Sequence, residues 1–368
     1  MTTEEERVRN AVITGWGKCL PPAVLSNHDL EQLTDTSDEW ITSRTGIKER
    51  RISHVEVSDL AAVAGHRALA AADMTAADLD LIILGTCTAD SLIPSAAALL
   101  QHKLGATHAA SFDLNAACSG FVYSLVVASN MIRAGTHERV LVVGAEKLHR
   151  HLDFTDRSTA VLFGDAAGAV VLEAGDEPTG VLASELGMDG TVADILQVPR
   201  DGSAGDVTAP VPTDSGIRMN GPEVFRRAVV TMGDAATRVL DQAGYGIDDV
   251  DIFIPHQANV RIIDAVAKRL HLPDSKVFVN IGSYGNTSAA TIPVALTEAL
   301  EQGRVAAGSL VVFAAFGAGL SWAAAAVRWG ERVEPLATSD AELVASTADA
   351  MELLQPNIDY FGRLVTTR

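Results

Sequence analysis

Short apolar runs alternate with alanine-rich amphipathic runs along most of the chain, and this alternation predicts strands and helices in turn. The apolar runs have the continuous hydrophobicity typical of strands buried on both faces; they are residues 11–15, 79–86 and 139–144. Residues 58–72 and 120–134 are predicted helices, the first capped by Ser58 and the second ended by Gly135. The pattern predicts an α/β protein built in layers.

One uncharged run, residues 310–327, is long enough to raise the question of a membrane span. It contains the sequence Gly-Ala-Gly at 317–319, and two glycines in a short interval favour a turn between two buried strands. Residues 1–10 contain three consecutive glutamates and no apolar stretch, so they do not form a signal peptide. We therefore expect a cytoplasmic protein without a membrane anchor.

Three pairs of similar segments indicate an internal repeat. The run from Asp80 resembles the run from Asp251, 171 residues later, and the strand from Val140 resembles the strand from Leu310, 170 residues later. Between them lie two turns of small residues, around Cys118 and Asn286, 168 residues apart. We expect two similarly folded halves with these two turns facing one cleft.

The chain accordingly divides into an N-terminal half, 1–180, a C-terminal half, 181–330, and an extension, 331–368. In the extension, Ser339 is expected to cap a helix that runs to about Leu354. Its apolar positions indicate a docking tail, and the sequence does not say where it docks.

The chain has 368 residues, of which 48% are hydrophobic, with 28 basic and 47 acidic residues and a net charge of -19. This composition excludes a mainly disordered chain, and the acidic surface argues against nucleic acid and anionic membranes as partners. The three cysteines, without a CxxC motif, indicate reduced thiols. The histidines show no metal-ligand spacing, and no GxGxxG follows a strand, so we expect no metal and no bound dinucleotide.

Cys118 is the candidate nucleophile because it precedes a predicted helix and has only small neighbours. The positive end of a helix dipole stabilises a thiolate, and small neighbours admit a bulky substrate. A buried structural cysteine remains the alternative for Cys118, and Cys19 and Cys87 are interpreted as structural.

His256 follows an apolar strand, where ligand sites form in α/β folds, and Asn286 lies in a glycine-flanked turn. Either residue alone is compatible with a structural role. Together with Cys118 they suit acyl transfer from a thioester, with the His and Asn donating hydrogen bonds to an enolate or oxyanion. A cysteine hydrolase with His256 as base uses the same residue types.

Six motifs carry a family resemblance that covers about nine-tenths of the chain. They are TSDEWITSRTGI at 36–47, NAACSGF at 115–121, FGDAAGA at 163–169, IPHQANVRII at 254–263, YGNTSAAT at 284–291 and FGAGLSW at 316–322. The chain resembles the β-ketoacyl-ACP synthase III family of the thiolase superfamily. The resemblance implies a thiolase fold, two similar α/β halves in a five-layer αβαβα arrangement, and a homodimer.

The resemblance also implies the reaction. An acyl-CoA would acylate Cys118, and malonyl-ACP would then lose CO2 to give an enolate that His256 and Asn286 stabilise. The enolate carbon would attack the Cys118 thioester, with the N–H groups of Cys118 and Gly319 as the oxyanion hole. CoA and the phosphopantetheine of the acyl carrier protein (ACP) would serve as carriers, with no permanently bound cofactor.

Further site residues follow from the resemblance alone. Those implied to bind CoA and substrate are Trp40, Arg44, Arg157, Phe225, Ala258 and Asn259. Those implied to contact ACP are Gln257, Arg261, Lys268 and Arg269; the spacing of seven puts Arg261 and Lys268 on one helix face. Those implied at the acyl pocket are Cys87 and Ile93, the latter on a loop that closes the partner subunit's pocket.

Four alternatives remain open. A specialised polyketide-priming ketosynthase, or one that accepts malonyl-CoA instead of malonyl-ACP, would use the same residues. So would an acyltransferase that works through Cys118 without decarboxylation. A catalytically silent subunit need not keep Cys118, His256 and Asn286, and a degradative thiolase would have a second cysteine where FGAGLSW has none. The starter acyl group does not follow from the sequence.

Overall fold

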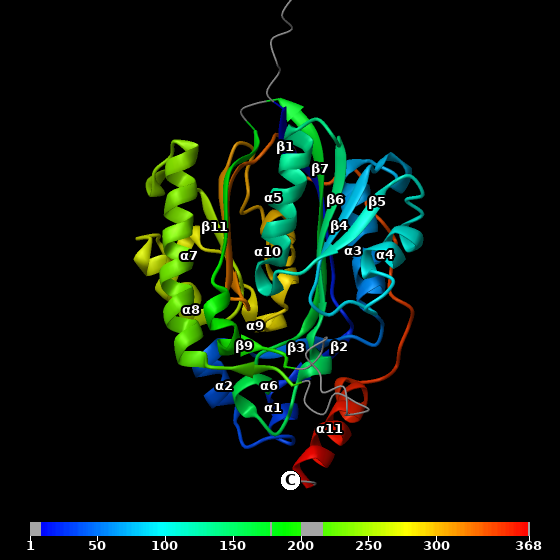
Figure 1. Cartoon of the computed structure of the whole chain (residues 1–368), viewed down its shortest axis with the longest axis vertical. Helices are drawn as coiled ribbons and strands as arrows, with labels where there is room; N and C mark the ends of the chain where they lie inside the picture. The colour runs from blue at the N-terminus through cyan, green and yellow to red at the C-terminus, as the bar shows by residue number, and fades with distance from the viewer. Residues whose placement is uncertain (1–8, 177–178, 200–215, 367–368) are drawn as a thin grey trace, which may run out of the picture.

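Two β-sheets with helices between and outside them make up the body of the protein (Figure 1). The computed structural model describes residues 9–176, 179–199 and 216–366. The acidic N-terminal segment, 1–8, lies outside the described residues.

The first sheet has the strand order β1-β7-β6-β4-β5, with β4 parallel to both of its neighbours. In that order its strands are Arg9–Cys19, Asp165–Asp176, Arg139–Lys147, Leu81–Gly85 and Ala110–Leu114. The second sheet has the order β11-β12-β13-β8, with strands Ile252–Pro255, Leu310–Gly317, Ser321–Arg328 and Gly180–Met188. The uncharged run 310–327 is therefore a pair of strands, as predicted.

Helices form the other three layers. Between the sheets lie α5 (Gly120–Arg133) and α10 (Thr291–Glu301), whose apolar side chains join one core with both sheets. The outer face of the first sheet carries α3 (Val57–Ala72) and α4 (Ala96–Leu104), and that of the second carries α7 (Gly221–Ala243) and α8 (Val260–Arg269). The expected αβαβα arrangement is confirmed (Figure 1).

Short elements close one end of the layers, at the bottom of Figure 1. The short helices there are α1 (Asn27–Leu30), α2 (Asp38–Thr45), α6 (Arg157–Ala160) and α9 (Ile281–Tyr284). The short strands are β2 (Ala23–Ser26), β3 (Glu49–Ile52), β9 (Leu196–Gln197) and β10 (Arg218–Met219). The 3₁₀ helices, in chain order, are η1 (Ala76–Asp78), η2 (Ala117–Ser119), η3 (Leu148–His151), η4 (Gly190–Ile195), η5 (Ile247–Asp249), η6 (Asp274–Lys276) and η7 (Ser288–Ala290).

The internal repeat has one constant offset in the structure. The first residues of β4 and β11, of β6 and β12, of η2 and η7, and of α5 and α10 are each 171 positions apart. This offset pairs Cys118 with Ala289 and Asn286 with Asn115, so the two catalytic candidates are not strict equivalents. They do lie in corresponding turns, as the sequence predicted.

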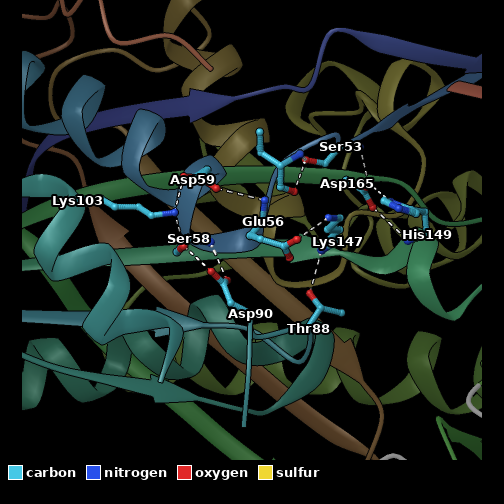
Figure 2. A network of polar contacts seen from close by, with 11 residues as sticks. Ser53, Glu56, Ser58, Asp59, Thr88, Asp90, Lys103, Lys147, His149 and Asp165 are labelled. Carbon is cyan, nitrogen blue, oxygen red and sulfur yellow. Dashed lines mark hydrogen bonds and ion pairs between the residues drawn. The ribbon is translucent and has the colours of Figure 1, made fainter. Parts of the chain in front are cut away.

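Helix α3 begins differently from the prediction. Its N-cap is Glu56, whose N–H donates to the Asp59 carboxylate at 3.3 Å, and Ser58 lies inside the first turn. Ser58 instead binds Asp90 through its N–H and its hydroxyl, and it accepts a hydrogen bond from Lys103 (Figure 2). Ser58 is thus a junction between α3, the loop after β4 and α4, and the prediction that it caps α3 is wrong.

The extension also differs from the prediction. Its helix, α11, is Ala350–Thr366, and the segment from 331 to 349 runs as an extended strap over α3. The strap bonds to the end of α3 through the Leu336 and Ala337 N–H groups, so a helix from Ser339 does not form. Asp349 and Glu352 accept each other's N–H groups at 2.8 and 3.0 Å, and this capping box starts α11. No helix among the described residues is long and apolar enough to span a membrane.

Candidate active site

Cys118 lies in η2, immediately before α5, and is 9% exposed. The preceding Ala117 has φ +48°, and its N–H donates to the Asn115 side-chain oxygen at 3.1 Å. The turn between β12 and β13 lies against this segment, because the Ser321 hydroxyl donates to the Ala116 carbonyl at 2.9 Å. A Cβ added at Gly317 would stand 2.7 Å from the Cys118 nitrogen. Cys118, the candidate nucleophile, is therefore framed by close backbone contact from the other half of the chain.

The ionisation of Cys118 differs from the expected stabilised thiolate. Burial raises the pKa of the Cys118 thiol to about 12, and a hydrogen bond with Ser288 offsets only part of this. In the free protein Cys118 is accordingly a thiol at neutral pH.

His256 follows β11 and is 2% exposed. Its backbone N–H donates to the Ala314 carbonyl at 2.8 Å, and its ring Nδ1 lies 2.7 Å from the Thr291 hydroxyl oxygen. Burial lowers the pKa of His256 to about 3, so the imidazole is neutral at physiological pH. A neutral ring carries one N–H, and Thr291 is placed to decide which nitrogen holds it.

Asn286 is held by the same kind of turn as Asn115. Its side-chain oxygen accepts the Ser288 N–H at 2.8 Å, and Ser288, like Ala117, has a positive φ, of +50°. The Asn286 backbone N–H donates to the Leu162 carbonyl at 2.9 Å. Because the amide oxygen is already occupied, the NH2 group is the part of Asn286 that remains to bind a ligand.

A buried carboxylate, that of Glu146, contacts these turns, and no motif in the sequence marks it as a site residue. It is 0% exposed and accepts hydrogen bonds from the hydroxyls of Thr88 at 2.5 Å and Ser288 at 3.1 Å. The Cys87 N–H also donates to it, at 3.2 Å. Burial raises the pKa of Glu146. Ser288 thus connects Glu146 with the Asn286 turn.

Two cavities meet at Cys118. The first, of about 340 Å³, we call the entrance cavity; it includes all three catalytic candidates and several residues implied to bind CoA. Its lining includes Cys118, His256, Asn286, Arg44, Phe225, Ala258, Asn259 and Arg261. The second, of about 280 Å³, we call the Cys87 cavity; its lining includes Cys87, Cys118, Leu148, His151 and Ile217. The thiol therefore has space on two sides.

Trp40, Arg44 and Arg157 come together beside the entrance cavity. The guanidinium carbons of Arg44 and Arg157 lie 5.1 and 5.0 Å from the centre of the Trp40 ring. Arg157 also donates to the Asp35 carbonyl at 2.6 Å. This stack of one indole and two guanidinium groups suits a flat ring with phosphates.

The four residues implied to contact ACP are not equivalent in the structure. Arg261 and Lys268 are exposed on α8, whereas Arg269 pairs with Asp234 of α7 at 2.6 Å. Gln257 is 1% exposed, and its amide donates to the carbonyls of Pro255 and Phe278 at 2.8 and 3.1 Å. Gln257 is a structural residue that joins β11 to the next segment, so the prediction of a surface contact there is wrong.

Ile93 does not line either cavity. Ile93 and Leu92 are 85% and 95% exposed, on the loop between β4 and α4.

Gly319, with φ +135°, lies in the turn that contacts the Cys118 segment. Asn259 caps α8, because its side-chain oxygen accepts the Arg261 N–H at 2.9 Å. Asn259 also lines the entrance cavity. Within the described residues, no three His, Cys, Asp or Glu side chains are grouped to hold a metal ion.

The chain is similar to known proteins over most of its length. Residues 112–190 match the family model described as 3-oxoacyl-[acyl-carrier-protein (ACP)] synthase III, and residues 240–329 match that of its C-terminal part. A Vibrio vulnificus strain YJ016 protein named β-ketoacyl-[acyl-carrier-protein] synthase III 2 is 53% identical over 352 residues. That match covers 95% of this chain and 96% of the relative.

A Symbiobacterium thermophilum β-ketoacyl-[acyl-carrier-protein] synthase III is 50% identical over 329 residues, covering 88% of this chain and 99% of the relative. The crystal structure of 3-oxoacyl-[acyl-carrier-protein] synthase III from Aquifex aeolicus superposes with a TM-score of 0.82 at 46% identity. It covers 87% of this chain and 100% of the other. These last two proteins match almost completely while leaving about an eighth of this chain unmatched.

Proposed function

The chain belongs to the 3-oxoacyl-[acyl-carrier-protein] synthase III family, and we propose that it is primed by an acyl-CoA at Cys118 and condenses that acyl group with malonyl-ACP. It is an acyltransferase with the thiolase fold of its relatives. The observation that carries the proposal is the entrance cavity, which places Cys118, His256 and Asn286 around one space that also includes Arg44 and Arg261.

In the first step the Cys118 sulfur attacks the thioester carbonyl of acyl-CoA. A bond from Sγ to the acyl carbon forms, the bond to the CoA sulfur breaks, and CoA leaves with the proton that the thiol loses. The N–H groups of Cys118 and Gly319 are proposed to hold the oxyanion of this step. Trp40, Arg44 and Arg157 are proposed to hold the adenine and phosphates, with Phe225, Ala258 and Asn259 along the pantetheine arm.

In the second step malonyl-ACP loses CO2, and the bonding electrons form an enolate. The Asn286 NH2 group and His256 Nε2–H donate to the enolate oxygen, each contributing about 3 kcal/mol. The enolate carbon attacks the Cys118 thioester, a carbon–carbon bond forms, and the carbon–sulfur bond breaks. Cys118 then takes up a proton, and the products are 3-ketoacyl-ACP, CO2 and CoA.

The acyl carrier protein is proposed to dock over α8. Arg261 and Lys268 are exposed two turns apart on one helix face, and Arg261 also lines the entrance cavity. The whole chain has a net charge of -19, so a local pair of cations would orient an acidic partner at the cavity mouth.

We propose that the protein is a homodimer whose interface includes the edge of the first sheet and the adjacent loop. Strand β5 ends the sheet, with side chains that are partly exposed along its length. The exposed pair Leu92 and Ile93 lies in the loop between α4 and β4, the strand next to β5. A second copy would cover both features, and Ile93 would reach the Cys87 cavity of the partner.

The test is incubation with acyl-CoAs of increasing chain length, followed by intact and peptide mass measurement. An acyl adduct on the peptide that contains Cys118, absent from Cys118→Ala and retained in Cys19→Ala, supports the priming step. If no acyl-CoA gives an adduct, the proposed priming step by acyl-CoA is refuted, and the result points to an acyl donor carried by ACP.

A further inference from the structure

The C-terminal helix α11 packs against the outside of the wall that bounds the Cys87 cavity. On its inner side this wall consists of Leu148 and His151 of η3 and of Ile217, which all line the cavity. The Ile217 N–H donates to the His151 carbonyl at 2.9 Å, so the two pieces of wall are joined. In Figure 1 α11 lies at the same end of the molecule as the short elements around the site.

Apolar side chains of α11 are buried against this wall. Leu354 is 0% exposed and Ala350 3%, and both belong to one apolar cluster with Leu148 and Ile217. Phe361, 3% exposed, lies so close to Gly216 that an added Cβ there would be 3.2 Å from its ring. The helix therefore contacts both pieces of the wall from outside.

A polar contact fixes the register of α11 on η3. The Asn357 amide donates to the His149 carbonyl at 2.5 Å. His149 is held from the other side by Asp165, which accepts its backbone N–H at 3.1 Å and lies 2.5 Å from its Nδ1; Asp165 also accepts the Ser53 N–H (Figure 2). The single turn η3 is thus clamped between β7 and α11.

We propose that α11 is a specificity-determining element: through Leu354 and Asn357 it positions the η3 wall and so sets which acyl groups fit beside Cys118. This inference rests on the proposed function, because it takes the Cys87 cavity as the place of the acyl chain. A turn of four residues has few internal hydrogen bonds, so its position depends on what packs behind it. The strap 331–349 tethers α11 to α3 and keeps the helix at this place.

The share of this chain that its relatives match differs between them, as expected if only some members of the family have a helix like α11. The Vibrio vulnificus relative matches 95% of this chain, and the Symbiobacterium thermophilum relative is itself almost fully matched at 88% of it.

The experiment compares full-length Leu354→Ala and Asn357→Ala with the wild type. The rate constant of Cys118 acylation is measured by intact mass for acetyl-, butyryl-, hexanoyl-, octanoyl- and decanoyl-CoA. Matched controls are Leu336→Ala, an exposed leucine of the strap, and Gln355→Ala, an exposed amide of α11. Thermal unfolding shows which variants are folded, and Asn357→Ala removes less packing than Leu354→Ala.

If α11 positions the wall, both variants raise the decanoyl-to-acetyl rate ratio by about tenfold, because an unsupported wall yields to longer chains while the thiol is unchanged. The two controls keep the wild-type ratio. A ratio that stays at the wild-type value, falls, or changes equally in the controls would overturn the inference. A wild type that no acyl-CoA acylates would instead refute the proposed function, so the two failures are distinct.

Discussion

His256 Nδ1 and the Thr291 hydroxyl oxygen are 2.7 Å apart, and the same hydroxyl lies 2.9 Å from the Ser288 carbonyl. The hydroxyl has one proton for these two acceptors. The hydroxyl is in position to donate to the Ser288 carbonyl, and the proposed condensation requires it to donate to Nδ1 instead, which leaves the ring proton on Nε2. In that arrangement the hydroxyl of α10 positions the proton of the histidine after β11.

Thr291→Val is expected to slow condensation by about 100-fold, because the variant keeps the shape of the side chain but loses the group that holds the proton on Nε2. Acylation of Cys118, which does not use this donor, should change far less. Single-turnover rates measured separately for the two steps check this. Thr291→Ser serves as the control and should restore condensation; equal losses in both steps would contradict the assignment.

The pKa of His256 predicts a specific pH dependence of stability. Folding holds the ring neutral with a pKa of about 3, whereas the unfolded chain binds the proton near 6.5. Between these values the unfolded state binds one more proton, so stability falls as pH falls, by about 1.4 kcal/mol per pH unit. When the free energy of unfolding is measured in urea between pH 6 and 4.5, its slope against pH should be shallower in His256→Gln than in the wild type by about that amount. Equal slopes would show that His256 is not buried as a neutral ring.

Gly317 has no room for a side chain beside the nucleophile. A Cβ there would stand 2.7 Å from the Cys118 nitrogen, a backbone atom that can move only if the turn moves. Gly317→Ala should therefore lower Cys118 acylation by at least about 100-fold by displacing the thiol and its N–H. Gly190→Ala is the control, because nothing lies within 4 Å of the added Cβ. Near-normal acylation in Gly317→Ala would contradict this picture of the site.

The docking proposal predicts an effect that depends on the acceptor. Lys268→Glu should raise KM for malonyl-ACP about tenfold, which corresponds to about 1.4 kcal/mol. Acylation by acyl-CoA should remain near the wild-type rate, because Lys268 is outside the entrance cavity lining. The control is Arg139→Glu, which reverses a charge at the start of β6, away from the strand ends that carry the site. The same rise in both variants would indicate only a general charge effect.

The residues that could be predicted from the sequence are those whose role is local. The apolar runs at β4, β6 and β12 are buried strands because their hydrophobicity is continuous, and small residues mark the turn of Cys118. The repeat could be detected from three weak matches, since each half buries the same kind of strand and helix.

Other roles depend on neighbours that are distant in the chain and could not be predicted. Thr291 and Glu146 act through hydroxyls and N–H groups brought together only by the packing of the two halves. Serine is a common N-cap residue, but the Ser58 N–H and hydroxyl both donate to the Asp90 carboxylate. Gln257 lies within a motif of binding residues, yet its amide satisfies buried carbonyls.

A single-turnover experiment distinguishes decarboxylative condensation at Cys118 from simple acyl transfer. Enzyme carrying an acyl group on Cys118 is freed of acyl-CoA and mixed with malonyl-ACP, and both released CO2 and ACP-bound product are quantified. If the protein is a condensing enzyme, one CO2 and one 3-ketoacyl-ACP form for each Cys118 adduct lost, and malonyl-CoA reacts far more slowly. Transfer of the acyl group to ACP without CO2 release would contradict this prediction and establish an acyltransferase without condensation.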